Sequence, residues 1–185
     1  MLLSLTAYAL IPLYTLMFVS GTNWFTSNLS VIGSWPDRRM AFFFLGIIIG
    51  LYYLVVLRRL LSCLPRHNWE TGILYAAFLL LLFAITTPYL PDSVPLQAFL
   101  HVVFAFSASV LLALCLYLIL WRLSALSQAS RRFLRPYRFS MAVITAVSAI
   151  LLVIAGIISS ALEIFFIIAT TILVQKLYSR YPRLQ

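Results

Sequence analysis

Long apolar stretches, separated by short polar segments, follow one another along the whole chain. Six can be drawn, at residues 2–19, 40–57, 71–87, 96–121, 139–158 and 161–178. A helix rises about 1.5 Å per residue, so roughly 20 apolar residues cross a hydrocarbon core about 30 Å thick. The pattern therefore predicts an all-α, polytopic transmembrane bundle of six spans that forms a single domain over residues 1–185.

Two details of this pattern concern helix geometry rather than function. We expect the first stretch to be a retained helix rather than a signal peptide, because no Lys or Arg precedes it and residues 18–20 are a poor cleavage site. Pro12 should kink this helix, because proline removes one helical hydrogen bond. Gly46 and Gly50 form a G-x-x-x-G motif in the second stretch, which predicts close packing against another helix.

The composition supports a membrane protein. Apolar residues make up 64% of the chain and charged residues only 9%, whereas a soluble domain carries about 25% charged residues. The formal charge is +9, but the basic residues stand at the ends of the apolar stretches. This placement favours contact with anionic lipid headgroups over nucleic-acid binding, which would need a basic face interleaved with exposed aromatic residues.

The distribution of basic residues predicts the topology. Eleven of the 13 Lys and Arg residues fall in the second-to-third turn, the fourth-to-fifth loop and the tail, and only Arg38 and Arg39 lie on the other side. Short loops rich in Lys and Arg remain in the cytoplasm. Six spans with both termini cytoplasmic satisfy this distribution, and the cell membrane is the expected location.

The segment from residue 122 to residue 138 is the most basic loop of the predicted topology. Within it Arg131, Arg132 and Arg135 flank Phe133 and Leu134. One interpretation is a short interfacial helix whose arginines contact lipid headgroups. The alternative is a solvated loop.

A group of polar residues near the outer side is the candidate site. His101 lies about five residues into the fourth span, or roughly 7 Å deep, Glu163 starts the sixth span, and Asp92 precedes the fourth. Ionisable groups within spans usually face the bundle interior and often mark sites. We expect His101 to face inward and to contact Glu163 first, then Asp92, then Ser30.

These residues also have purely structural explanations. Glu163 completes a capping-box pattern with Ser160, Asp92 fits a cap or a turn, and His101 could make a single interhelical hydrogen bond. No catalytic signature, cofactor motif or phosphate loop is present, and a single His within the spans is too few for a zinc site. We therefore predict no catalytic residue, metal or cofactor.

Three features together resemble a known family. They are the N-L-S-V-I-G segment from Asn28 to Gly33, the P-Y-L-P-D turn from Pro88 to Asp92 that leads to His101, and the acid Glu163. They are similar to the small bacterial six-span membrane proteins of the domain-of-unknown-function 998 family. The resemblance implies a six-helix bundle in a bacterial cytoplasmic membrane and matching positions at Ser30, Asp92, His101 and Glu163. Asn28 stands where an acid would be expected.

Three functions follow as hypotheses. The first is a non-enzymatic binding protein, sensor or accessory subunit, with a polar site near the outer leaflet formed by His101, Asp92, Glu163, Ser30 and Asn28, and with lipids or a membrane protein as partner. The second is an intramembrane enzyme that acts on a lipid-linked substrate through His101 and a carboxylate. The third is a small transporter, which the lack of paired Gly or Pro breaks disfavours.

Overall fold

The computed structural model describes residues 1–181, which contain helices and no β-strand. In chain order the elements are α1 (Leu2–Leu5), the π-helical segment η1 (Thr6–Leu10), α2 (Ile11–Phe18), α3 (Leu29–Ser34), α4 (Arg39–Leu61), α5 (Asn68–Thr86), α6 (Pro95–Leu126), α7 (Gln128–Ala155) and α8 (Ser160–Arg180). The all-α prediction is confirmed for the described residues.

Five helices, α4 to α8, are long and apolar enough to cross a membrane, while the helical run Leu2–Phe18 is shorter. The fold is consistent with a multi-pass membrane protein. The short first run contains Pro12 at the second position of α2, directly after the π-helical turn η1. Proline lacks the N–H that continues an α-helix, and the wider π-helical turn lies just before it.

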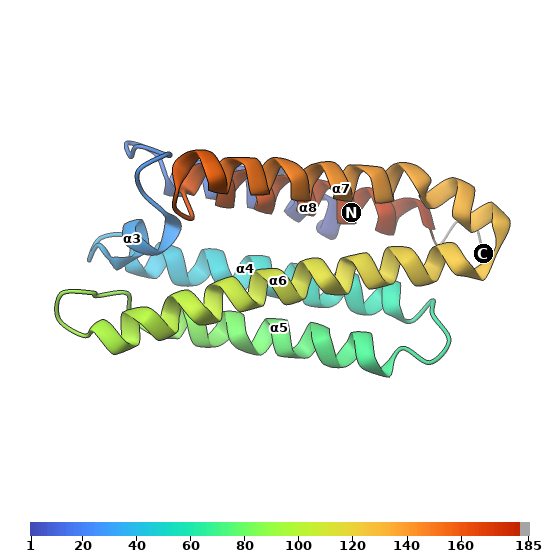
Figure 1. Cartoon of the computed structure of the whole chain (residues 1–185), viewed down its shortest axis with the longest axis horizontal. Helices are drawn as coiled ribbons and strands as arrows, with labels where there is room; N and C mark the ends of the chain where they lie inside the picture. Colours follow the sequence, from blue (N-terminus) through green and yellow to red (C-terminus); the bar gives the residue numbers. More distant parts are fainter. Residues whose placement is uncertain (182–185) are drawn as a thin grey trace.

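The helices form two layers (Figure 1). Helices α4, α5 and α6 lie in one layer, and α7, α8 and the N-terminal helical run lie in the other. Ser127 joins α6 to α7 at one end of the bundle, and the two helices diverge toward the opposite end, where α3 lies. We call these the arginine-rich end and the α3 end.

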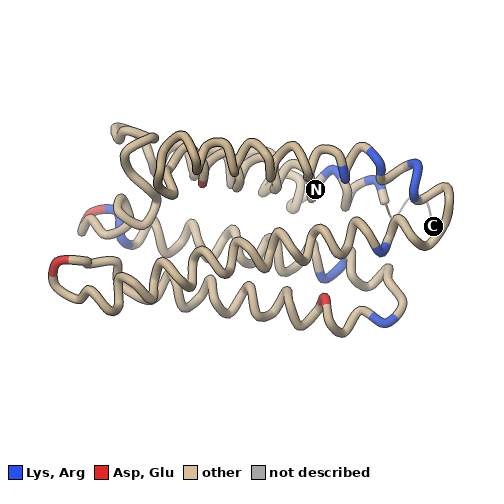
Figure 2. Tube along the Cα trace, in the orientation of Figure 1, with Lys and Arg blue, Asp and Glu red and all other residues tan. Residues whose placement is uncertain are grey.

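Charge separates the two ends (Figure 2). The basic residues of the arginine-rich end are Arg58, Arg59, Arg66, Arg122, Arg131, Arg132, Arg135, Arg138, Lys176 and Arg180. Arg38 and Arg39 lie at the α3 end, since α4 begins at Arg39 shortly after α3 ends. Asp37 precedes them, and Asp92 lies in the turn between α5 and α6 at the same end. Arg183, which belongs to the predicted cytoplasmic tail, lies outside the described residues. The division of charge predicted along the sequence is therefore present in space, although it does not by itself say which end faces the cytoplasm.

The main core lies toward the arginine-rich end. Its fully buried leucines come from the ends of α4 and α6 and from the start of α7, namely Leu57, Leu60, Leu61, Leu120, Leu123 and Leu134. A smaller cluster at the α3 end holds Phe18, Leu29, Ile32 and Leu45. The bundle is therefore closed at one end and less completely packed at the other.

Gly46 and Gly50 bring α4 against α5, as the motif predicts. A Cβ atom on Gly46 would lie 2.5 Å from Cγ2 of Ile85, and one on Gly50 would lie 2.9 Å from Cδ2 of Leu81. Neither position has room for a side chain unless the facing side chains of α5 shift.

The predicted basic loop is wrong, because residues 122–138 are helical on both sides of Ser127. The Ser127 hydroxyl accepts the Ser130 N–H and caps α7. Leu134 and Tyr137 are buried, which fixes this turn of α7 against the core. Arginine placed on the opposite face does not end a helix, so α6 and α7 extend beyond the apolar stretches. Arg131, Arg132 and Arg135 are exposed on α7.

Candidate functional site

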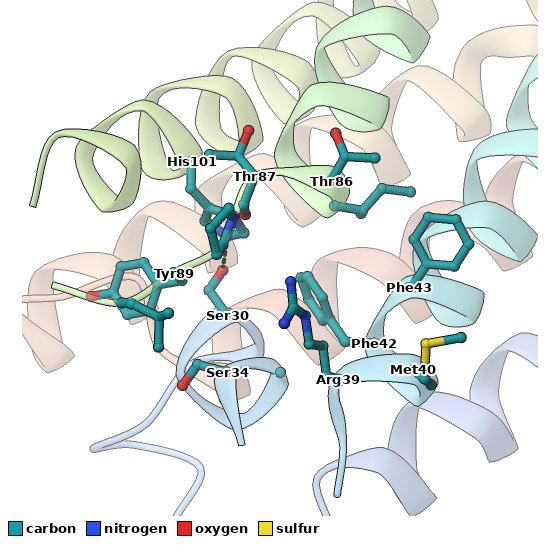
Figure 3. A pocket seen from close by; sticks show the side chains of 14 residues that line it. Ser30, Ser34, Arg39, Met40, Phe42, Phe43, Thr86, Thr87, Tyr89 and His101 are labelled. Atoms are coloured by element: carbon teal, nitrogen blue, oxygen red, sulfur yellow. Dashed lines mark hydrogen bonds between the residues drawn. The ribbon is translucent and has the colours of Figure 1, made fainter. Parts of the chain in front are cut away.

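His101 is the centre of the polar site at the α3 end. It lies in the second turn of α6 with only 1% of its side chain exposed. Its Nδ1 lies 2.8 Å from the Thr87 carbonyl oxygen, and its Nε2 lies 2.7 Å from the Ser30 hydroxyl (Figure 3). A carbonyl can only accept, so Nδ1 carries the proton. In the neutral ring, Nε2 is then the acceptor of the Ser30 O–H.

The turn before α6 sets the position of the imidazole. Thr87 ends α5 in an extended conformation, which the following Pro88 favours. Its carbonyl therefore leaves the helical direction and is available to His101. Phe42 and Tyr89 have ring centroids 6.1 Å and 5.6 Å from that of His101. The ring is thus fixed by a hydrogen bond and by packing.

Ser30 is presented by the short helix α3. The Asn28 side chain accepts the Val31 N–H at 2.8 Å and caps the helix. Leu29 and Ile32 are buried beneath it. Within N-L-S-V-I-G, Asn28 thus starts the helix, the apolar residues hold it, and Ser30 is turned toward His101.

Glu163 holds α3 from the other layer. Its carboxylate accepts the Leu29 N–H at 2.7 Å. The predicted capping box is wrong, since the cap of α8 is Ser159, whose hydroxyl accepts the Leu162 N–H. The first two N–H groups of α8, those of Ser160 and Ala161, donate to the carbonyls of residues 27 and 24. The segment before α3 is therefore docked on the start of α8.

The structure brings together only part of the predicted constellation. His101 contacts Ser30, the third of its expected partners, and its hydrogen bonds are not to Glu163 or Asp92. Glu163 and Asn28 instead position α3. Asp92 is exposed in the turn before α6 and makes no side-chain hydrogen bond with the described residues. Among residues 1–181, no carboxylate orients the imidazole.

A pocket of about 220 Å³ adjoins the His101–Ser30 pair (Figure 3). Most of its wall is apolar, and we call it the polar pocket only because it also holds Ser30, Arg39 and His101. Arg39 is the charged residue in its wall. The residue is exposed, and its side chain makes no hydrogen bond or ion pair within residues 1–181. The neighbouring Arg38 differs, because its guanidinium donates to the Phe18 and Ser20 carbonyls. Sequence reasoning missed Arg39; its place among the two basic residues of this end was the only signal.

A larger cavity of about 650 Å³ lies between the two layers. Its wall is mainly apolar and comes from α4 to α8, and it meets the polar pocket at Ser30, Phe42, Ile85 and Tyr89. Wall residues of α6 and α7 are exposed, with Phe106 at 52% and Leu152 at 38%. The cavity thus opens between these diverging helices. Ser148, also in the wall, has a buried hydroxyl without a hydrogen-bond partner.

Two further polar groups were not predicted. Near the arginine-rich end, Glu70 is 4% exposed and pairs with Arg122 at 2.6 Å. Deeper in the bundle, the Tyr53 hydroxyl lies 2.6 Å from that of Thr170 and 2.9 Å from that of Thr171. These groups join α5 to α6 and α4 to α8. Their hydrogen bonds satisfy most of the buried polar atoms, but Oε2 of Glu70 has no partner among the described residues.

Comparison of the chain with protein-family models, curated protein sequences and solved structures gave no significant match. Within residues 1–181 no group of three His, Cys, Asp or Glu side chains could hold a metal ion. Function is therefore inferred from the geometry of the α3 end.

Proposed function

We propose that this protein binds a membrane phospholipid, with the phosphate beside Arg39 and an acyl chain in the cavity between the layers. One observation carries the proposal: a polar pocket with an unpaired guanidinium and a large apolar cavity share a wall at Ser30. That arrangement complements an amphiphile. A soluble anion alone would leave the cavity without an occupant.

The chemistry of each half supports this assignment. Arginine presents planar N–H donors that match phosphate oxygens, and Arg39 has no protein partner within residues 1–181 to compete. The cavity lies within the range of about 300–1,000 Å³ that ligand sites occupy. Its opening between α6 and α7 faces the surroundings of the bundle, where lipid chains lie if these helices cross a membrane.

Binding can be measured by native mass spectrometry on the delipidated full chain. Phosphatidylglycerol should bind the unaltered protein, and Arg39→Gln should weaken this binding about tenfold or more. Arg58→Gln is the matched control, since Arg58 is an exposed arginine of the opposite end. Inorganic phosphate added to the lipid-bound protein should not displace the lipid. Equal lipid binding by all three proteins, or displacement by phosphate, would contradict the proposal.

The proposal includes a topology of six spans in the bacterial cytoplasmic membrane, with both termini inside and the α3 end in the outer leaflet. The charge distribution supports it. In a variant lacking Cys63 and Cys115, a cysteine at Ser93 should react with an impermeant maleimide in intact cells, and one at Ser127 should not. Reaction at Ser127 alone would reverse the topology.

At the arginine-rich end, Arg131, Arg132 and Arg135 are proposed to contact anionic headgroups of the inner leaflet. Each charge near such a surface is worth about 1 kcal/mol. The full chain in phosphatidylglycerol nanodiscs should lose stability when all three become Gln, and in phosphatidylcholine nanodiscs it should not. An identical loss in both lipids would remove this contact from the account.

A further inference from the structure

The three groups Thr87, His101 and Ser30 form a directed chain of hydrogen bonds. The Thr87 carbonyl accepts from Nδ1, which leaves Nε2 as the acceptor for the Ser30 hydroxyl at 2.7 Å. An activated nucleophile has this structural pattern: its hydroxyl is hydrogen-bonded to a base, and a third group holds the other nitrogen of that base. Here the third group is a neutral carbonyl, which fixes the tautomer without adding charge.

Ser30 differs from the other hydroxyls of this region in its surroundings. Its side chain lies in the walls of both the polar pocket and the apolar cavity, while His101 is 1% exposed. By contrast the Ser34 hydroxyl donates to the Val31 carbonyl, and the Thr86 hydroxyl donates to the Leu82 carbonyl. Ser30 is thus the hydroxyl that faces a base on one side and ligand space on the other.

We propose that Ser30 is the nucleophile and His101 the general base of an ester-cleaving site, whose substrate is an acyl ester of the phospholipid in the proposed function. The substrate assignment rests on that function. In a phospholipid the ester carbonyls lie between the phosphate and the chains. With the phosphate at Arg39 and a chain in the cavity, an ester is therefore brought to the shared wall, where Ser30 lies.

The first half of the reaction transfers the acyl group. The Ser30 oxygen bonds to the ester carbonyl carbon while its proton passes to Nε2 of His101. The bond from that carbon to the lipid alkoxide then breaks, and the alkoxide leaves with the proton from Nε2. The products are acyl-Ser30 and a lysophospholipid.

Water completes the cycle. His101 takes a proton from water, the hydroxide oxygen bonds to the acyl carbon, and the bond to the Ser30 oxygen breaks as that oxygen regains the proton. The net reaction converts one ester and one water into one fatty acid and one lysophospholipid. No electron transfer or further co-reactant is required.

The test uses an alkyl fluorophosphonate probe with a fluorescent reporter on the purified full chain in nanodiscs. The modified residue is mapped by peptide mass spectrometry in the unaltered protein, so the result does not depend on whether a variant folds. We expect labelling at Ser30, loss of labelling in Ser30→Ala, and a rate about 100-fold lower in His101→Asn. Ser93→Ala, which alters an exposed serine of the same end, should label normally.

A second readout is fatty acid released from phosphatidylglycerol, which should vanish in Ser30→Ala while native mass spectrometry still detects bound lipid. Labelling that is absent, or that maps to another residue, overturns the nucleophile. If lipid binds but neither labelling nor release occurs, the esterase fails and the binding function stands. If Ser30 is labelled but no phospholipid binds or is cleaved, Ser30 remains a nucleophile with His101 as its base. The phospholipid substrate and the proposed function are then both wrong.

Discussion

Two arginines, one at each end of the bundle, differ in their surroundings. At the arginine-rich end Arg122 pairs with Glu70 and also donates to the carbonyls of Arg66 and Pro65. At the α3 end Arg39 lies in a pocket wall without a partner within residues 1–181. Each guanidinium stands near the end of a long helix, so the contrast arises from what surrounds it.

Packing follows the same division. Leu60, Leu61 and Leu123 are fully buried where α6 and α7 meet. Where the same helices diverge, the small residues Ala105, Ala108 and Ser109 of α6 line the cavity. This face of α6 borders the cavity. The comparison indicates that the packed core lies at one end, while the helices leave a cavity toward the other.

The largest loss of stability is expected when the Arg122–Glu70 ion pair is broken. Arg122→Gln leaves the buried Glu70 carboxylate without its cation, which should cost about 3 kcal/mol. A fall in the apparent Tm of the protein in detergent measures it. Arg39→Gln is the matched change at the other end and should leave Tm within about 1 °C, because no protein contact is lost. Equal destabilisation by the two variants would remove the distinction between the ends.

Truncation of apolar side chains sharpens the packing difference. Leu120→Ala, at a side chain 1% exposed, should destabilise by about 2–3 kcal/mol through the hole it leaves. Phe106→Ala, at a cavity-lining residue 52% exposed, should cost under about 1 kcal/mol. Denaturation in the same detergent compares them. A larger loss for Phe106→Ala would show that the cavity is closed in solution.

The glycine contact between α4 and α5 gives a smaller effect. Gly46→Ala places a methyl group 2.5 Å from Ile85 and should cost about 1–2 kcal/mol by overpacking. Gly72→Ala, in α5 where the added Cβ meets nothing within 4 Å, should instead stabilise by about 0.5–1 kcal/mol. Thermal unfolding of both variants measures the two signs; the same sign for both would argue against this helix contact.

The smallest expected change in stability comes from filling the cavity. Ala149→Phe in α7 adds a ring to the wall of the cavity between the layers and should leave Tm nearly unchanged. Phospholipid retained after purification should fall severalfold, because the chain and the ring compete for one volume. Ala146→Phe, at an exposed position of the same helix, is the control. Undiminished lipid in Ala149→Phe would place the chain elsewhere.

Much of the fold could be predicted because transmembrane helices are specified by length and apolarity alone. Helices α4, α5 and α8 begin and end within a few residues of the apolar stretches. Helices α6 and α7 extend further, because their charged turns bury Leu123 and Leu134 on the opposite face. The helical run formed by the first apolar stretch, Leu2–Phe18, is shorter than the five candidate spans. The count of six spans therefore stays a prediction.

The site was less predictable because a six-residue helix organises it. Depth along the spans indicated that His101, Ser30 and Glu163 share one end of the bundle. It could not indicate that α3 lies between the two layers, so that Glu163 binds the backbone of Leu29 while His101 receives Ser30. Arg39 was interpreted only as a topology signal, because sequence does not reveal which arginine borders a pocket.

Photo-crosslinking tests the central claim, lipid in the cavity of the α3 end, most directly. A phosphatidylglycerol with a diazirine in its acyl chain is bound to the full protein, irradiated, and mapped by peptide mass spectrometry. We expect crosslinks at Ala105 and Ala149 of the cavity wall to exceed those at Val153, which is 81% exposed on α7, and to disappear in Ala149→Phe. Crosslinks concentrated at Val153, unchanged by that substitution, would contradict the account.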